Sequence, residues 1–346
     1  MASSNSPSVA ATASPASQSS PLVLRIIGAV ALAHLINDLI QAVLPAIYPM
    51  LKDSYGLTFT QVGLITLTFQ LTASLLQPWV GYYTDRRPQP FLLPAGMICT
   101  LIGILMMSQV GSFPLILLAA ALIGIGSSTF HPEASRVARL ASGGRYGLAQ
   151  SSFQVGGNAG TAFGPLLAAA IIIPYGQGNV AWFGLFALFA LVVLYAISRW
   201  YANHLRLYKL KQGQAATHGL SRNRVISALV VLGLLVFSKY FYMASFTSYF
   251  TFYLIEKFDL SVASSQLHLF LFLGAVAAGT FFGGPIGDKI GRKAVIWFSI
   301  LGVAPFTLLL PHVDLFWTSV LSVVIGFILA SAFSAIVVYA LSLIHI

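Results

Sequence analysis

The feature that most constrains this chain is a series of apolar runs, each long enough to cross a lipid bilayer and separated by short polar turns. A spanning helix needs about 20 apolar residues, so the chain has room for roughly ten. The chain is 58% hydrophobic and only 8% charged, which excludes an ordinary soluble enzyme. The sequence predicts an all-α polytopic membrane protein with spans near 24–50, 59–83, 91–110, 114–139, 147–173, 180–200, 225–254, 262–286, 294–311 and 315–340.

The basic residues predict how these spans are oriented. With the N-terminus in the cytoplasm, all but three of the 18 Lys and Arg residues fall on the cytoplasmic side, as the positive-inside rule requires. Lys52 and Lys257 fall on the other side, and Lys239 lies within a span. The net charge of +10 is therefore explained by membrane topology, and we expect no nucleic-acid partner.

Composition divides the chain into four predicted parts. Residues 1–23 form an uncharged Ser- and Ala-rich stretch up to Ser20, which we expect to be a disordered cytoplasmic tail. Residues 24–200 form a bundle of six spans, 201–224 a basic cytoplasmic linker, and 225–346 a bundle of four spans. The single cysteine, Cys99, gives neither a disulfide framework nor a thiolate metal site.

A short motif recurs at matched positions of the two bundles. The turn after span two reads GYYTDRRPQP from Gly81, the turn after span eight reads GPIGDKIGRK from Gly284, and their aspartates Asp85 and Asp288 are 203 residues apart. Here the chain resembles the major facilitator superfamily, whose signature has the form Gly-x-x-x-Asp-Arg/Lys-x-Gly-Arg-Arg/Lys. The second copy matches in full, and the first has Gly81, Asp85 and Arg86 but then diverges; the matching residues of the second copy are Gly284, Asp288, Lys289, Gly291, Arg292 and Lys293.

This resemblance implies a fold of two six-helix bundles and a role for the motif in gating. A glycine allows close helix approach, and a carboxylate beside it can pair with basic groups in contacts that break and reform. The alternative is a pair of positive-inside turns that happen to contain an aspartate. Span five carries part of another exporter signature, with Gly160, Gly164 and Pro165 in place and Ala168 and Ala169 where a final glycine pair is usual.

Longer stretches resemble the drug exporters of this superfamily, including HLINDLIQAVLPAIYP from His34 and FHPEASRVARLASGGRYGLAQ from Phe130. The resemblance implies proton-coupled efflux of a small anionic drug, such as the phosphonate antibiotic fosmidomycin. It also implies a monomer in the bacterial inner membrane, with the lipid bilayer, a small-molecule substrate and protons as partners and without a cofactor. Such a transporter has twelve spans, so we expect this chain to be a fragment that lacks the last two and whose sequence after about residue 340 is not authentic.

Span one carries the most polar face. An ionisable group within a membrane costs a few kcal/mol or more, so a functional role is the first interpretation. Asp38 is the leading candidate for the proton site, and the alternative is a structural network between helices. Its neighbours on an arc of about 100° are His34, Asn37 and Gln41.

Span seven places a cation beside an aromatic face. Lys239 suits an anionic ligand, or it could pair with Asp38, because the 203-residue repeat places the two at similar depths. Tyr242 and Tyr249 are candidates for substrate binding, although such aromatics alone more often serve packing.

Span four supplies two further proton-coupling candidates, His131 and Glu133. Glu133 is three residues before Arg136, a spacing that predicts a pair, and His131 could act in a proton relay or be structural. Uncharged polar residues on spans two and five are expected to line a cavity, namely Gln70, Gln154 and Asn158.

Other functions fit less well. The chain has no phosphate-binding loop of an ATP-driven pump, no selectivity-filter motif of a channel and no convincing cluster of metal ligands. In a membrane-embedded enzyme His131 and Glu133 would be the candidate acid and base, but two residues apart on a helix they point nearly 160° away from each other. A proton-coupled importer of a small organic solute remains the alternative transporter, because the fold alone does not set direction.

Overall fold

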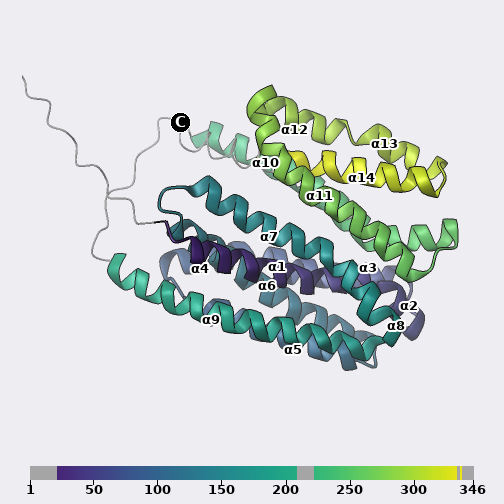
Figure 1. The fold of residues 1–346 in the computed structure, drawn as a ribbon, viewed down its shortest axis with the longest axis horizontal. Helices are drawn as coiled ribbons and strands as arrows, with labels where there is room; N and C mark the ends of the chain where they lie inside the picture. Colours follow the sequence, from purple (N-terminus) through teal and green to yellow (C-terminus); the bar gives the residue numbers. More distant parts are fainter. Residues whose placement is uncertain (1–21, 209–221, 333–335, 337–346) are drawn as a thin grey trace, which may run out of the picture.

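The protein, described from a computed structural model, is a set of long helices running roughly side by side (Figure 1). The structure describes residues 22–208, 222–332 and 336. The first half contains α1 (Leu24–Ala46), α2 (Tyr48–Tyr55), α3 (Phe59–Gln70), the π-helix η1 (Leu71–Leu75), α4 (Gln77–Arg86), α5 (Leu92–Gln109), α6 (Phe113–Ala141), α7 (Tyr146–Leu167), the π-helix η2 (Ala168–Ile172), α8 (Ile173–Tyr175), the 3₁₀ helix η3 (Gln177–Trp182) and α9 (Phe183–Tyr208). The second half contains α10 (Arg222–Phe258), α11 (Val262–Ile290), α12 (Arg292–Leu301), α13 (Ala304–Leu309), the 3₁₀ helix η4 (Leu310–His312) and α14 (Leu315–Ser331).

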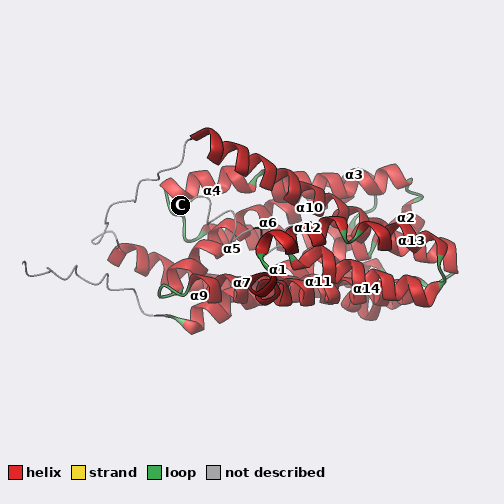
Figure 2. Ribbon diagram, turned by 90° about the horizontal axis from the view of Figure 1, so that it is seen from above, coloured by secondary structure: helices red, strands yellow, loops and turns green. Residues whose placement is uncertain are grey.

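The described part of the chain is helical and has no strand, which Figure 2 shows at a glance. Eight of its helical segments are long and apolar enough to cross a membrane, and α14 is a shorter apolar helix. Within the described residues each predicted span coincides with a helix or a broken helix, and the prediction of an all-α polytopic membrane protein is confirmed. Residues 333–335 and 337–340 of the last predicted span lie outside the described residues.

The predicted linker 201–224 is helical at both of its ends. α9 continues to Tyr208 and α10 begins at Arg222, so only 209–221 separate them, and these lie outside the described residues. The apolar run ends at about residue 200, but a helix continues past the membrane when its side chains tolerate water. Arg206 in the last turn of α9 also favours the helix, because a cation there complements the helix dipole.

Small residues set the packing of α7 on α1. A Cβ atom added at Gly156 or Gly160 would overlap the α1 backbone at Ala31 and Leu35, and one at Gly164 would overlap Ala42. The two helices therefore approach as closely as glycine permits, as in other membrane helix pairs. α11 then packs across α7, which joins the two halves.

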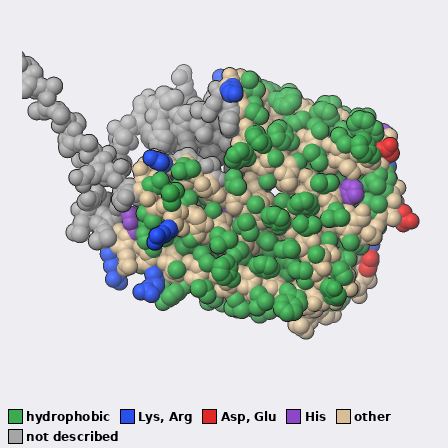
Figure 3. Space-filling view, viewed as in Figure 1, with side chains coloured by type: hydrophobic (Ala, Val, Ile, Leu, Met, Phe, Trp, Pro, Cys, Tyr) green, Lys and Arg blue, Asp and Glu red, His purple; other side chains and the backbone are tan. Residues whose placement is uncertain are grey.

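Charges gather at opposite ends of the molecule. On the face drawn in Figure 3, the visible Lys and Arg side chains lie mostly toward one end and the visible Asp and Glu side chains toward the other. The two halves are hydrogen-bonded at the acidic end, where the Gln266 amide donates to the carbonyl of Ala46 over 2.8 Å and the hydroxyls of Thr66 and Ser248 lie 3.2 Å apart. We call these ends the basic end and the acidic end.

Candidate functional site

A cavity of about 1010 Å³ lies between the two halves. α1, α3, α4, α6 and α7 contribute to its wall from the first half, and α10, α11 and α14 from the second. Its lining includes most of the polar residues predicted from the sequence, namely His34, Asp38, Gln41, Gln70, His131, Gln154, Asn158 and Lys239.

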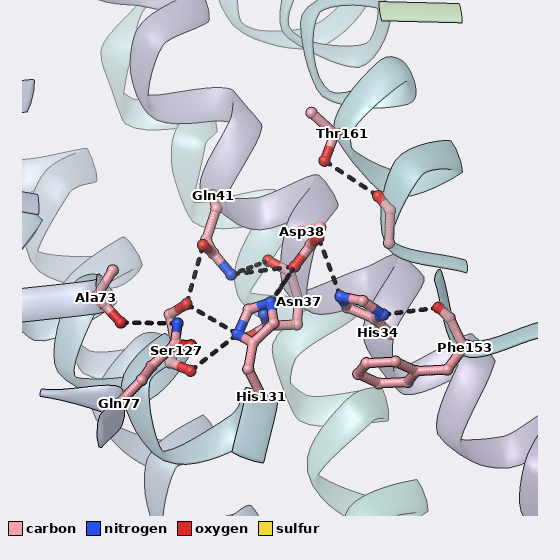
Figure 4. A network of polar contacts seen from close by, with 11 residues as sticks. His34, Asn37, Asp38, Gln41, Ala73, Gln77, Ser127, His131, Phe153 and Thr161 are labelled. Carbon is pink, nitrogen blue, oxygen red and sulfur yellow. Dashed lines mark hydrogen bonds and ion pairs between the residues drawn. The ribbon is translucent and has the colours of Figure 1, made fainter. Parts of the chain in front are cut away.

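Two histidines hold Asp38 between them, and we call these three residues the Asp38 cluster (Figure 4). Nε2 of His34, on the same helix, lies 3.2 Å from Oδ2, and Nε2 of His131, on α6, lies 3.4 Å from Oδ1. His34 is buried, whereas the side chains of Asp38 and His131 are 18% and 26% exposed. The cluster is thus held inside the protein but open to the cavity on one side.

The other ring nitrogen of each histidine shows which tautomer is present. Nδ1 of His34 lies 2.7 Å from the carbonyl oxygen of Phe153, and Nδ1 of His131 lies 3.0 Å from that of Ser127. A carbonyl oxygen only accepts hydrogen bonds, so both Nδ1 atoms carry hydrogen. In a neutral ring Nε2 then has a lone pair, and both lone pairs face a carboxylate. Such a convergence of acceptors requires a positively charged species, either a proton on a ring or a cation between them.

Amide groups fix the carboxylate of Asp38 in place. Asn37 donates to Oδ1 over 3.0 Å, and Gln41 donates to the same oxygen over 3.3 Å. The Ser127 hydroxyl in turn donates to Gln41 over 3.0 Å. Asn37 is fully buried, is not among the residues that line the cavity and contacts Asp38, and its predicted role as a substrate ligand stays a prediction.

A glycine of α7 makes room for the cluster. A Cβ atom at Gly157 would lie 2.5 Å from Nε2 of His34 and 2.7 Å from Oδ2 of Asp38, which is closer than real Cβ atoms come to such groups. The sequence predicted close packing of span five from its glycines, but not that one of them faces the ionisable residues of span one.

Lys239 lies on the opposite half and makes no contact with Asp38. Its ammonium donates to the Ser299 hydroxyl over 2.8 Å and to the carbonyl of Leu329 over 2.7 Å. Within the described residues no carboxylate lies within ion-pair distance of it, so the predicted alternative of an Asp38 pair is not observed. Lys239 is a buried cation on the cavity wall with neutral oxygen partners.

The two predicted substrate-binding tyrosines, Tyr242 and Tyr249, are not among the residues that line the cavity, and their role as substrate ligands stays a prediction. The Tyr242 hydroxyl pairs with that of Thr307 over 2.8 Å, and its ring packs on Phe246. The Tyr249 hydroxyl lies against Gly63 of α3. Lys239 and the two tyrosines share one broad face of α10, and that face contacts several helices. Tyr242 faces α13 and Tyr249 faces α3.

A second polar cluster lies toward the basic end. It consists of Asp85, Glu133 and Arg136, and we call it the Asp85 cluster. Arg136 of α6 pairs with Asp85 of α4 and donates to the buried Glu133 over 2.7 Å and to the carbonyl of Thr84 over 2.7 Å. The pair of Glu133 with Arg136 that the sequence predicted is present, and Glu133 lies outside the Asp38 cluster. His131 and Glu133 belong to separate clusters, which also removes the geometry that a joint acid and base would need.

The motif glycines act in different ways. A Cβ atom at Gly81 would lie 3.8 Å from Pro132, an ordinary contact, so that position is not closely packed. Gly291 connects α11 and α12 with φ of +95°, a conformation that L residues rarely adopt. Arg86 stacks on Tyr82, and Lys289 and Lys293 are exposed. The surroundings of Gly284, Asp288 and Arg292 lie outside what the structure describes.

Comparison with known proteins shows the family to which the chain belongs. The family model of the Major Facilitator Superfamily matches residues 30–345. The chain is 61% identical over 340 residues to the fosmidomycin resistance protein of Escherichia coli (strain K12), covering 98% of this chain and 84% of that protein. It is 41% identical over 325 residues to the uncharacterized MFS-type transporter YfnC of Bacillus subtilis (strain 168), covering 93% and 79%.

A solved structure shares the arrangement of helices at low sequence identity. A bacterial homologue of the human lysosomal transporter Spinster, in an inward-facing and occupied conformation, superposes with a TM-score of 0.70 and 16% identity. The match covers 92% of this chain and 74% of that one. At this identity the likeness concerns the fold alone.

Proposed function

Because the chain belongs to the Major Facilitator Superfamily, we propose that it exports a small anionic compound in exchange for protons, with fosmidomycin as the first candidate substrate. It is a secondary transporter of the multi-pass membrane class. The relative that is 61% identical over nearly the whole chain is a fosmidomycin resistance protein, which supports both the substrate and the direction.

The observation that carries the proposal is that one cavity has a buried cation on one half and the Asp38 cluster on the other. Transporters of this kind bind substrate and coupling ion near the interface of their repeats, and the halves move about that site. We place alternating access between the group α1 to α9 and the group α10 to α14. The hydrogen bonds at the acidic end join these groups and would have to break when that end opens.

Lys239 is the proposed anion site. An ammonium group has three donors, and neutral oxygens of Ser299 and Leu329 take two of them. A phosphonate oxygen near the remaining donor would gain attraction that is strong at low dielectric. Gln70, Gln154 and Asn158 offer uncharged donors on the same cavity wall.

The Asp38 cluster is the proposed proton site. It already needs a positive charge among its three converging acceptors, and a proton is the smallest species that supplies one. Moving an empty carrier with a bare carboxylate through a closed, dry state is costly. We propose that the substrate is carried on the outward step and that the proton on this cluster permits the return step.

The proposed orientation places the basic end and the N-terminus in the cytoplasm of a bacterium, with the protein in the inner membrane as a monomer. The separation of charges in Figure 3 supports this, since basic residues concentrate on the cytoplasmic side. Hydrogen bonds join the halves at the acidic end, which faces away from the cytoplasm in this orientation. We therefore interpret this structure as the inward-facing state, which would bind the drug from the cytoplasm. The motif residues, including the exposed Asp85 that pairs with the half-buried Arg136 of α6, would act in gating at the cytoplasmic end.

The test is the fosmidomycin susceptibility of a drug-sensitive bacterium that expresses the full chain. We expect resistance from the wild type and loss of resistance in Asp38→Asn and Lys239→Ala. Lys257→Ala is the matched control, because this lysine of the same helix donates to the carbonyls of Pro311 and Val313 away from the cavity.

Three results would contradict the proposal. With membrane expression verified, a sensitive wild-type strain would remove fosmidomycin as a substrate and leave only the fold. Resistance that survives Lys239→Ala would remove the anion site. Net uptake of the drug by energised cells would instead favour the importer.

A further inference from the structure

The three residues of the Asp38 cluster have the composition and spacing of a metal site. Each offers one ligand atom, an Nε2 from His34 and from His131 and a carboxylate oxygen from Asp38, and these atoms lie within 4.8 Å of one another. Nε2 of His34 lies 3.2 Å from Oδ2 of Asp38, and Nε2 of His131 lies 3.4 Å from Oδ1. Ligands bound 2.0–2.1 Å from a tetrahedral zinc ion lie about 3.3 Å apart. Both nitrogen to oxygen distances match this spacing, and side-chain rotation has to bring the ligand atoms that are farther apart, at up to 4.8 Å, onto one ion.

We propose that the Asp38 cluster binds a divalent transition-metal ion of the Zn²⁺, Co²⁺ or Ni²⁺ type. Two imidazoles with one carboxylate favour these ions over Mg²⁺ and Ca²⁺, which prefer oxygen ligands throughout. The sequence did not suggest the site, because His131 lies on a different helix far along the chain.

The groups around the cluster prepare its ligands for a metal. Histidines that bind metals usually donate their other ring N–H to a carbonyl or carboxylate, which turns the lone pair of the ligating nitrogen toward the ion. Both histidines do this here, His34 to Phe153 and His131 to Ser127, and both free lone pairs point at Asp38. The amides of Asn37 and Gln41 hold the carboxylate.

The cluster leaves one coordination position open. The protein supplies three ligands, and the cluster forms part of the cavity wall, so water or an oxygen of a bound anion would complete a tetrahedral ion. An ion reaches the site through the cavity, toward which His131 is 26% exposed. A metal ion on the cluster would take the place of the proton proposed above. Its binding is measured without fosmidomycin, so the outcome is separate from whether the drug is exported.

The experiment measures metal binding by the full chain, purified through an affinity tag that contains no histidine. Equilibrium dialysis gives the number of Co²⁺ or Zn²⁺ ions bound, and the visible absorption of bound Co²⁺ reports tetrahedral nitrogen and oxygen ligation. We expect one ion per wild-type chain, and an affinity at least about tenfold weaker in His131→Ala and in Asp38→Asn.

His268→Ala is the matched control. Nδ1 of His268 lies 2.8 Å from the carbonyl of Ser264, much as in the cluster histidines, but in the described part of the chain His268 belongs to no group of metal ligands. It should bind the ion like the wild type. Size-exclusion profiles verify that each variant is folded. If His131→Ala does not fold, the Asp38→Asn variant tests the proposal, because asparagine keeps the shape of the aspartate side chain.

Three results would overturn the proposal. One is a wild-type chain that takes up no ion at micromolar metal. Another is His268→Ala losing the ion as completely as His131→Ala does. The third is an Asp38→Asn protein that binds Co²⁺ with unchanged affinity and an unchanged spectrum.

Discussion

The two polar clusters of the first half each join an aspartate to a side chain of α6, but their cationic partners differ in kind. In the Asp38 cluster the partner on α6 is His131, and in the Asp85 cluster it is Arg136. An arginine keeps its charge at any accessible pH, whereas a histidine gains and loses a proton near neutrality. The Asp85 cluster therefore contains a permanent cation, whereas the Asp38 cluster, on the cavity wall, is the one we propose as the proton site.

The largest effect on transport should come from removing the carboxylate of Asp38, in the proposed proton site. Asp38→Asn keeps the size of the side chain but cannot carry the coupling proton, so fosmidomycin transport driven by a pH gradient in proteoliposomes should fall at least about a hundredfold. The measurement is drug flux with and without the gradient. Gradient-driven flux at the wild-type rate would exclude Asp38 from coupling.

The next largest effect concerns stability at the Asp85 cluster. Arg136→Met leaves Glu133 buried without its cation, and breaking a buried pair in this way costs about 3–5 kcal/mol. Unfolding of the purified protein in detergent measures this. The double variant Arg136→Met with Glu133→Gln removes the stranded charge and should recover part of the loss. A single variant as stable as the wild type would show that Glu133 does not depend on Arg136.

A pair of glycine substitutions compares the crowding of the two regions. Gly157→Ala pushes a methyl group into His34 and Asp38, and overpacking of this kind costs about 1–3 kcal/mol and should lower transport clearly. Gly81→Ala places its methyl group at an ordinary 3.8 Å from Pro132 and should be tolerated. Both effects are read as drug flux and as thermal unfolding. Equal losses at both positions would contradict the difference in packing.

The smallest effect on stability is expected at the exposed end of the Asp85 cluster. Asp85 is 74% exposed, and an ion pair of that kind contributes about 1 kcal/mol or less. Asp85→Asn should therefore leave the unfolding midpoint close to that of the wild type. A loss as large as that of Arg136→Met would mean that the two carboxylates act as one buried network.

The sequence predicted what depends on one helix at a time. Apolar length placed the spans, and helical spacing grouped His34, Asp38 and Gln41 on one face and paired Glu133 with Arg136. These contacts lie within three or four residues, where the helix repeat fixes the geometry.

Contacts between helices could not be predicted in the same way. The approach of His131 to Asp38 and of Arg136 to Asp85 depends on how α6 sits against α1 and α4, which no local spacing encodes. For the same reason Tyr242 and Tyr249 were assigned to the cavity while their hydroxyls face Thr307 and Gly63. One residue in the sequence did hint at such a contact. Gly157 lacks a side chain at the point where α7 passes His34 and Asp38.

Proton release on drug binding tests the central claim most directly. The purified full chain is held in weakly buffered detergent solution, fosmidomycin is added, and a pH indicator reports protons that leave the protein. The account predicts that the wild type releases protons at drug concentrations that saturate binding and that Asp38→Asn releases none. Saturable drug binding by the wild type without any release of protons would contradict exchange at the Asp38 cluster.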